Sequence, residues 1–121
     1  MALLLSRLVL GFLLVATQPQ ATGIAWIIVQ SEATRPVAVI IEVDGRPFHR
    51  FVAKTADVFP PIVANIRAPL PVGRHIVVVR SSVQPKPDTL RLNLRREAWV
   101  TVFIRDHWFR LGVEYRAPML I

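Results

Sequence analysis

The sequence of 121 residues contains no cysteine, which excludes disulfide bonds, thiolate metal sites and attachment of a lipid to a cysteine. Its five glycines are scattered, so the glycine-rich loops that hold phosphate groups are also excluded. Charged residues make up only 19% and hydrophobic residues 53%, a balance that excludes intrinsic disorder. We therefore expect a single folded core, because the length leaves no room for a second one.

Negative charge is scarce as well. Asp and Glu number 8 against 15 Lys and Arg, which gives a formal net charge of +7. Lys54 and Lys86 are the only lysines, so arginine supplies most of the positive charge. Such a surface attracts nucleic acid, anionic lipid and acidic proteins through the same long-range force. Charge alone therefore does not choose among these partners, and a GC-rich genome enriches arginine too.

The N-terminal segment lacks an apolar run that could cross a bilayer, which takes about 20 residues. Arg7 is followed by the apolar residues 8–16 and then by a polar stretch, the order that is typical of a secretory signal. We favour a cleaved signal peptide over residues 1–21. No small-x-small triplet is clean, so an apolar helix retained as an anchor by residues 2–17 is the first alternative, and a buried helix of a soluble protein is the second.

An export signal places residues 22–121 outside the cytoplasm. We expect this domain in the periplasm or on the outer face of the membrane, anchored there if the leader is retained. Nucleic acid is then not a partner.

Beyond Gly23 the apolar residues recur with period two, which predicts strands rather than helices. Eight strands in roughly ninety residues predict an all-β fold, and we favour a small antiparallel β-sandwich of about seven or eight strands after an N-terminal apolar helix. The predicted strands cover Ile24–Gln30, Val37–Val43, Pro47–Ala53, Ile62–Arg67, His75–Ser81, Thr89–Leu94, Ala98–Arg105 and Phe109–Tyr115.

Turn residues mark the boundaries of these strands. Asp44-Gly45 tolerates positive φ angles and predicts a tight hairpin turn. The stretches that contain Pro69 and Pro71, and residues 85–88 with two prolines, are predicted as loops because proline lacks the donor that a β-ladder requires.

Two predicted strands, residues 75–79 and 98–104, are apolar on both faces. Either they are central strands covered on both sides, or one face of each contacts another molecule. Leu92 and Val100 are predicted to lie in the core, whereas Trp108, beside a turn, is predicted to be exposed.

Two short motifs carry a family resemblance. Val-Asp-Gly at 43–45, followed by Leu-Pro-Val-Gly-Arg-His-Ile-Val-Val-Val at 70–79, resembles PEGA-like and prealbumin-like small β-sandwich modules of exported bacterial proteins. The resemblance covers residues 24–104. It implies an attachment or surface-binding unit without catalytic residues.

The residues themselves give no pattern for catalysis, so we expect no enzyme activity and no cofactor. His49, His75 and His107 form no close ligand pair, and we interpret them as ordinary surface or strand-end histidines rather than metal ligands. Asp106-His107 is interpreted as a turn pair instead of a catalytic dyad, because neighbours on a strand point to opposite faces. Neither a G-x-S-x-G motif nor a recognisable carboxylate pair occurs.

The arginines of the last three predicted strands are candidate anion-binding residues. If these strands form a meander, their side chains make one basic surface for anionic envelope lipid or polysaccharide. We favour the alternative of a solvated face with interspersed acids. The set comprises Arg91, Arg95, Arg96, Arg105 and Arg110.

Apolar residues near the C-terminus are candidate partner-binding residues, since burial of an apolar side chain contributes more than an exposed ion pair. They are Trp99, Phe103, Trp108, Met119, Leu120 and Ile121. The leading hypothesis is an exported, non-catalytic interaction or structural module. It would be an accessory subunit on the periplasmic side of a membrane-associated complex, with a protein partner in or at the membrane. The alternative is a peripheral binder of anionic envelope lipid or polysaccharide through arginines.

Overall fold

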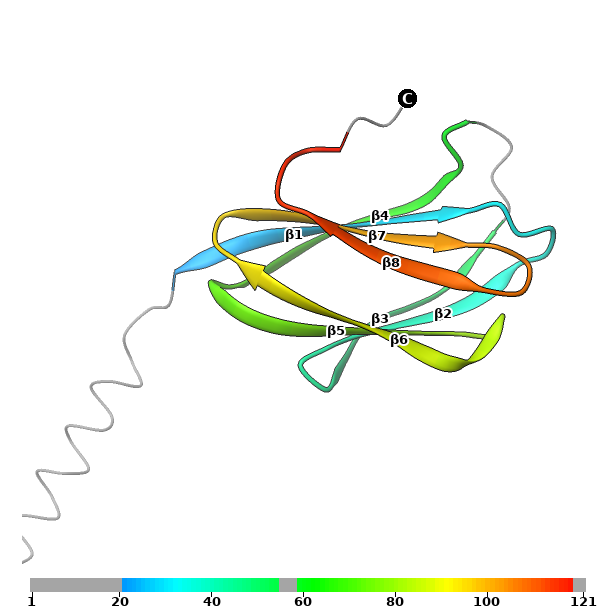
Figure 1. Cartoon of the computed structure of the whole chain (residues 1–121), viewed down its shortest axis with the longest axis horizontal. Helices are drawn as coiled ribbons and strands as arrows, with labels where there is room; N and C mark the ends of the chain where they lie inside the picture. Colours follow the sequence, from blue (N-terminus) through cyan, green and yellow to red (C-terminus); the bar gives the residue numbers. More distant parts are fainter. Residues whose placement is uncertain (1–20, 55–58, 119–121) are drawn as a thin grey trace, which may run out of the picture.

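The computed structural model describes residues 21–54 and 59–118, which form eight β-strands (Figure 1). Each strand overlaps one of the eight predicted from the period-two pattern, and no described residue is helical. The strands are β1 (Thr22–Ser31), β2 (Val37–Val43), β3 (Arg46–Ala53), β4 (Ile62–Pro71), β5 (Gly73–Ser81), β6 (Gln84–Leu94), β7 (Glu97–Ile104) and β8 (Phe109–Glu114).

The predicted signal or anchor helix falls on residues 1–20, outside the described residues. The candidate partner residues Met119, Leu120 and Ile121 lie outside them as well. Within residues 21–54 and 59–118, no helix has the length and apolar character needed to cross a membrane.

The strands form two four-stranded sheets that face each other like the layers of a β-sandwich (Figure 1). The first sheet has the strand order β4-β1-β7-β8 and the second has the order β3-β2-β5-β6. The all-β prediction is confirmed in this form. Consecutive strands repeatedly change sheets, as in the steps from β1 to β2 and from β6 to β7.

One strand pair departs from the predicted antiparallel arrangement. β1 and β7 pair in parallel, with Ile24 opposite Glu97 and Ser31 opposite Ile104. A parallel pair needs a long crossover connection, and strands β2 to β6 supply one by passing mostly through the opposite sheet. The local sequence of a strand does not encode the direction of its distant neighbour.

Alternate side chains of both sheets build a common core. In β7, Ala98, Val100, Val102 and Ile104 are fully buried, while the residues between them point to the outer face. Leu92 in the second sheet is 1% exposed and Val100 in the first is 0% exposed, so the prediction that both lie in the core is confirmed.

The hairpin predicted at Asp44-Gly45 joins β2 to β3, and both residues have positive φ angles, 52° and 79°. The predicted loops around the prolines are wrong, because Pro69 and Pro71 belong to β4 and residues 85–88 belong to β6. Both are edge strands, and an edge strand tolerates proline because one of its sides needs no ladder donor.

Side chains of β6 close the gap between the two sheets along one side. Gln84 Oε1 accepts a hydrogen bond from the backbone N–H of Phe109 at 3.2 Å, and Asp88 Oδ2 accepts one from the N–H of Leu111 at 3.1 Å. These bonds satisfy donors on the free edge of β8 that no neighbouring strand pairs. The residues predicted as a loop therefore join the edges of two sheets.

Candidate functional site

The outer face of the first sheet carries a group of large apolar side chains, which we call the aromatic face. They come from its two central strands, whose other side chains fill the core. In the parallel register Trp26 lies directly opposite Trp99, so the two indoles occupy neighbouring strands at the same level. The aromatic face consists of Ile24, Trp26 and Ile28 on β1 and Trp99 and Phe103 on β7, of which Ile28 is only 3% exposed.

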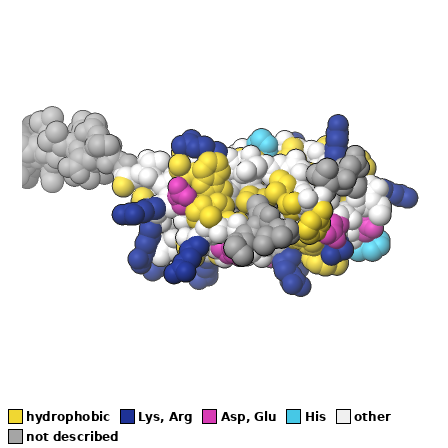
Figure 2. All heavy atoms as spheres, turned by 90° about the horizontal axis from the view of Figure 1, so that it is seen from above, with side chains coloured by type: hydrophobic (Ala, Val, Ile, Leu, Met, Phe, Trp, Pro, Cys, Tyr) yellow, Lys and Arg dark blue, Asp and Glu magenta, His cyan; other side chains and the backbone are white. Residues whose placement is uncertain are grey.

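Arginines border this face. Arg67 on β4 is the cross-strand neighbour of Trp26, and Arg110 on β8 is the neighbour of Phe103. Figure 2 looks onto this side of the molecule and shows hydrophobic side chains over the sheet, with Lys and Arg mostly at the margins. A flat apolar centre with a charged rim is the composition of many protein interfaces.

The predicted partner residues Phe103 and Trp108 lie together. Their ring centroids are 6.3 Å apart with the rings tilted by 38°. Trp108 is 42% exposed, so the prediction that it is exposed is confirmed. Trp99 is half-buried on the same sheet, four residues before Phe103 along β7.

Two of the predicted anion-binding arginines are held by this cluster. The guanidinium of Arg105 lies 5.1 Å from the centre of the Phe103 ring, and its Nη1 forms an ion pair of 2.6 Å with Glu32. Arg110 lies 5.4 Å from the centre of the Trp108 ring. Both cations therefore already have partners within the domain, which reduces what they offer to an external anion.

The five candidate arginines do not form the single basic surface that a meander would create. β6 belongs to the second sheet, so Arg91 lies on the opposite outer face from Arg110. Arg95 and Arg96 occupy the turn before β7, whereas Arg105 follows its far end. A strand of eight residues spans roughly 26 Å, which separates Arg95 and Arg96 from Arg105.

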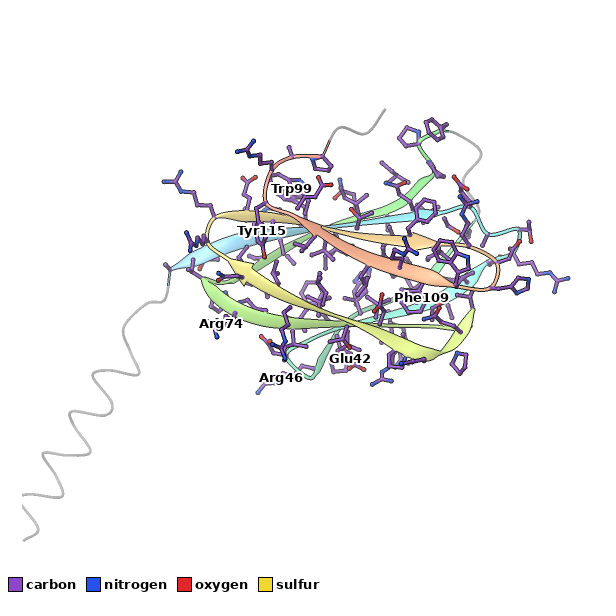
Figure 3. The ribbon with its side chains drawn as sticks, viewed as in Figure 1. Glu42, Arg46, Arg74, Trp99, Phe109 and Tyr115 are labelled. Atoms are coloured by element: carbon purple, nitrogen blue, oxygen red, sulfur yellow. The ribbon has the colours of Figure 1, made fainter. Side chains whose placement is uncertain are left out.

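Arg95 and Arg96 instead line a hollow at one end of the sandwich. It has a volume of about 730 Å³ and is lined by Asn93, Arg95, Arg96, Glu97, Trp99 and Tyr115. The hydroxyl of Tyr115 accepts a hydrogen bond of 3.1 Å from the backbone N–H of Asn93, which connects the end of β8 to β6. Figure 3 shows Trp99 and Tyr115 at this end, with Arg74 at the same end on the second sheet and Phe109 between the sheets.

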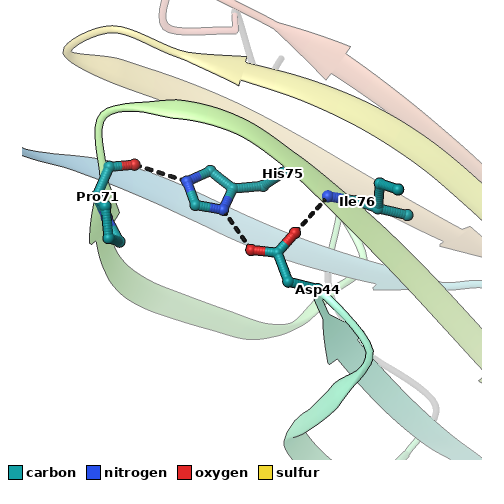
Figure 4. A network of polar contacts seen from close by, with 4 residues as sticks. All are labelled: Asp44, Pro71, His75 and Ile76. Atoms are coloured by element: carbon teal, nitrogen blue, oxygen red, sulfur yellow. Dashed lines mark hydrogen bonds and ion pairs between the residues drawn. The ribbon is translucent and has the colours of Figure 1, made fainter.

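His75 forms a buried network that sequence reasoning missed (Figure 4). Its side chain is 8% exposed, its Nδ1 lies 2.6 Å from Asp44 Oδ2, and its Nε2 lies 2.6 Å from the carbonyl oxygen of Pro71. Both ring nitrogens face acceptors, and this arrangement favours the protonated imidazole, in which both nitrogens donate. His75 lies near the start of β5, as the strand-end interpretation has it, but the interpretation as a surface histidine is wrong because the residue is buried.

The ionisation of this pair follows from its surroundings. Burial alone would lower the pKa of His75, but the hydrogen bonds to Asp44 and to Pro71 outweigh it and raise the pKa. The hydrogen bond from His75 and a second one from the N–H of Ile76 lower the pKa of Asp44. Asp44 thus ties the β2–β3 turn to β5, and His75 ties both to the end of β4.

Asp106 and His107 lie in the turn between β7 and β8, as predicted. Asp106 Oδ1 accepts hydrogen bonds from the N–H and the hydroxyl of Thr34, at 2.6 and 2.9 Å. These bonds lower the pKa of Asp106. The carboxylate therefore fastens the β1–β2 connection to the β7–β8 turn, and its hydrogen bonds go to Thr34 rather than to His107.

The described residues bring no three His, Asp or Glu side chains together in a way that could hold a metal ion. Comparison with known proteins adds no assignment, since no protein-family model matches the chain and a search of the curated proteins finds no significant match. The resemblance to PEGA-like modules rests on the Val-Asp-Gly and Gly-x-His motifs alone. In the structure these two motifs meet, because Asp44 and His75 are hydrogen-bond partners.

Proposed function

We propose that this protein is an exported, non-catalytic interaction module that binds a protein partner through the aromatic face of its first sheet. The leader-like residues 1–21 support export, and an accessory role on the periplasmic side of a membrane complex follows from that location. The observation that carries the proposal is the composition of the aromatic face, where two tryptophans and Phe103 lie on adjacent central strands.

Energetics favour this face over a charged one. Burial of an apolar side chain contributes roughly 1.5 to 3 kcal/mol, and an exposed ion pair about 0 to 1 kcal/mol. Tryptophan is also enriched among the residues that dominate binding energy at interfaces. Trp26 and Trp99 are only partly buried, and a partner would cover the part of each that remains accessible.

Site-specific photocrosslinking in native cells tests the proposal. A photoreactive residue at Thr101 lies between Trp99 and Phe103 on the outer face of β7, and the matched control at Val78 lies on the outer face of β5 in the other sheet. We expect a single discrete adduct from position 101 and none from 78. The double substitution Trp99→Gln/Phe103→Gln should abolish the adduct, whereas Ile76→Gln should not.

Equal crosslinking from both positions, or an adduct that survives the double substitution, would falsify the assignment of this face.

A second experiment concerns the C-terminal residues Met119-Leu120-Ile121. Truncation after Pro118 should release the domain from its complex while leaving it folded, and raised salt alone should not. If salt releases the complex and truncation does not, the arginines carry the binding instead.

A further inference from the structure

The end of the sandwich at which β1 begins carries a group of exposed arginines from three separate segments, which we call the arginine end. Arg74 on β5 is the cross-strand neighbour of Asn93. Arg95 and Arg96 form the β6–β7 turn, which begins two residues after Asn93. The N–H of Asn93 donates to the hydroxyl of Tyr115. Arg116 follows Tyr115 in the chain and is the fourth arginine at this end. The arginine end comprises Arg74, Arg95, Arg96 and Arg116.

The side chains of these arginines make no hydrogen bond, ion pair or ring contact with the part of the chain that the structure describes. This distinguishes them from Arg105, which is paired with Glu32, and from Arg80, which is paired with Glu42. Two acids, Glu97 and Glu114, lie at the same end. The arginines outnumber them, so the end as a whole is positive.

Aromatic and apolar surface accompanies this charge. The hollow beside Arg95 and Arg96 has Trp99 and Tyr115 among its lining residues, and Tyr115 is 52% exposed. Val72, in the β4–β5 connection, is 43% exposed. Tryptophan and tyrosine next to arginine is the combination found where proteins meet the headgroup region of a bilayer.

The first described residue of the chain enters the domain at this same end. The N–H of Val72 donates to the carbonyl of Ala21 at 2.8 Å, and the N–H of Ile24 donates to the carbonyl of Arg96 at 2.8 Å. Residues 1–20, with their apolar run, therefore join the domain beside the arginines. A leader held in a membrane would bring this end of the sandwich close to the lipid surface.

We propose that the arginine end is a contact surface for the headgroups of anionic phospholipids, with the hollow beside Arg95 and Arg96 receiving a phosphate group. This inference rests on the proposed export to a membrane but not on the protein partner. Guanidinium groups bind phosphate oxygens through two parallel hydrogen bonds. Trp99 belongs both to the aromatic face and to the lining of this hollow, whereas Thr101 and Phe103 lie further along β7 and do not line it.

Vesicle flotation tests the proposal with residues 22–121, since all described core residues lie between Ala25 and Phe109. We expect flotation with vesicles that contain 30% phosphatidylglycerol in phosphatidylcholine, and none with phosphatidylcholine alone. An arginine near an anionic surface contributes roughly fivefold to partitioning. The double substitution Arg95→Gln/Arg96→Gln should therefore lower partitioning by about tenfold or more.

The matched control is Arg35→Gln/Arg50→Gln, which removes the same charge from exposed positions outside the arginine end. It should leave partitioning within about twofold. An equal loss in both double variants would show that net charge alone drives binding and would overturn the proposal. Thermal melts confirm that each variant is folded.

Two further measurements distinguish lipid headgroups from a soluble phosphate and from an anionic polymer. Soluble glycerol phosphate at millimolar concentration should not displace the domain from vesicles; displacement would make the hollow a small-molecule site and overturn the proposal. Binding to dextran sulfate that requires Arg95 and Arg96, without flotation on lipid, would assign the surface to an anionic polymer and overturn it too. Crosslinking from Thr101, which does not line the hollow, should be unaffected by these substitutions, so the two proposals fail separately.

Discussion

The outer faces of the two sheets differ although the inner faces of the sheets are alike. The central strands of the first sheet expose part of Trp26, Trp99 and Phe103. Those of the second sheet present Arg74, Arg80 and Glu42 among smaller apolar residues, and Arg80 and Glu42 form an ion pair.

The difference between the outer faces lies in the aromatic residues of their central strands, which the first sheet has and the core does not require. A sandwich needs one apolar face from each sheet, and both sheets supply it. The second sheet has charged residues on its other face, beside the aliphatic residues Val52 and Ile76, which are 58% and 48% exposed, and it has no tryptophan there. The additional aromatic residues of the first sheet therefore point to a role outside the fold.

The inner faces provide the largest expected effect. Leu92→Ala in the second sheet removes a fully buried side chain and should lower the free energy of unfolding by about 2 to 5 kcal/mol. Arg91→Ala, next to it on the outer face, should change it by less than about 0.5 kcal/mol. Chemical denaturation measures both. A neutral Leu92 variant would show that the second sheet does not share the common core.

The buried histidine gives the next largest effect. His75→Leu removes two hydrogen bonds from a protonated imidazole and should cost about 1 to 3 kcal/mol near neutral pH. His107→Leu, in an exposed turn, is the control and should cost less than about 0.5 kcal/mol. Urea denaturation of the two variants at pH 6 compares them.

The ionisation of His75 also makes the free energy of unfolding depend on pH. Because folding raises the pKa of His75, its contribution is complete below the ordinary value of 6.5 and is lost as pH rises through the raised pKa. Folding lowers the pKa of Asp44, so its contribution is present above 3.8 and is lost as acid protonates it in the folded state. The wild-type protein should therefore lose stability as pH rises above 6.5 through the raised pKa of His75, and His75→Leu should remove that slope. An unchanged slope in the variant would contradict the protonated state.

Two glycines compare the sheets at the level of the backbone. Gly45 in the hairpin of the second sheet has a φ of +79°, so Gly45→Val should cost about 1 to 2 kcal/mol. Gly112→Val in β8 of the first sheet is the control, because an added Cβ there meets no atom within 4 Å. Thermal melts should show a lower midpoint for the first variant only. Equal midpoints would place the strain of the turn elsewhere.

The smallest effect belongs to the charged outer face of the second sheet. Arg80→Ala breaks the 3.1 Å ion pair with Glu42, and because half of the Arg80 side chain is exposed the cost should be about 0 to 1 kcal/mol. The loss should shrink further in 1 M salt. A cost above 2 kcal/mol would mean that this face is structurally as important as the core.

Much of the fold could be predicted because alternation is a local property. The alternation of Leu92 with Arg91 and of Val100 with Trp99 places each strand and its buried side, and Asp44-Gly45 fixes the hairpin through its own backbone preferences. The two-sided apolar character of residues 98–104 left two alternatives open, a central strand or a contact with another molecule, and β7 is a central strand. These features depend on residues that are neighbours in the chain.

The arrangement of the candidate sites depended on tertiary structure. The sequence places Arg91 and Arg110 on nearby strands, but the step from β6 to β7 changes sheets and puts them on opposite faces. Asp44 and His75 are 31 residues apart and meet only because β2 pairs with β5. The parallel pairing of β1 with β7 brings Trp26 beside Trp99. By itself, the sequence determined which residues form strands and which side of each is buried, because side-chain alternation and turn chemistry act locally; only the tertiary structure decided which strands are neighbours, because that choice minimises exposed apolar surface over the whole chain.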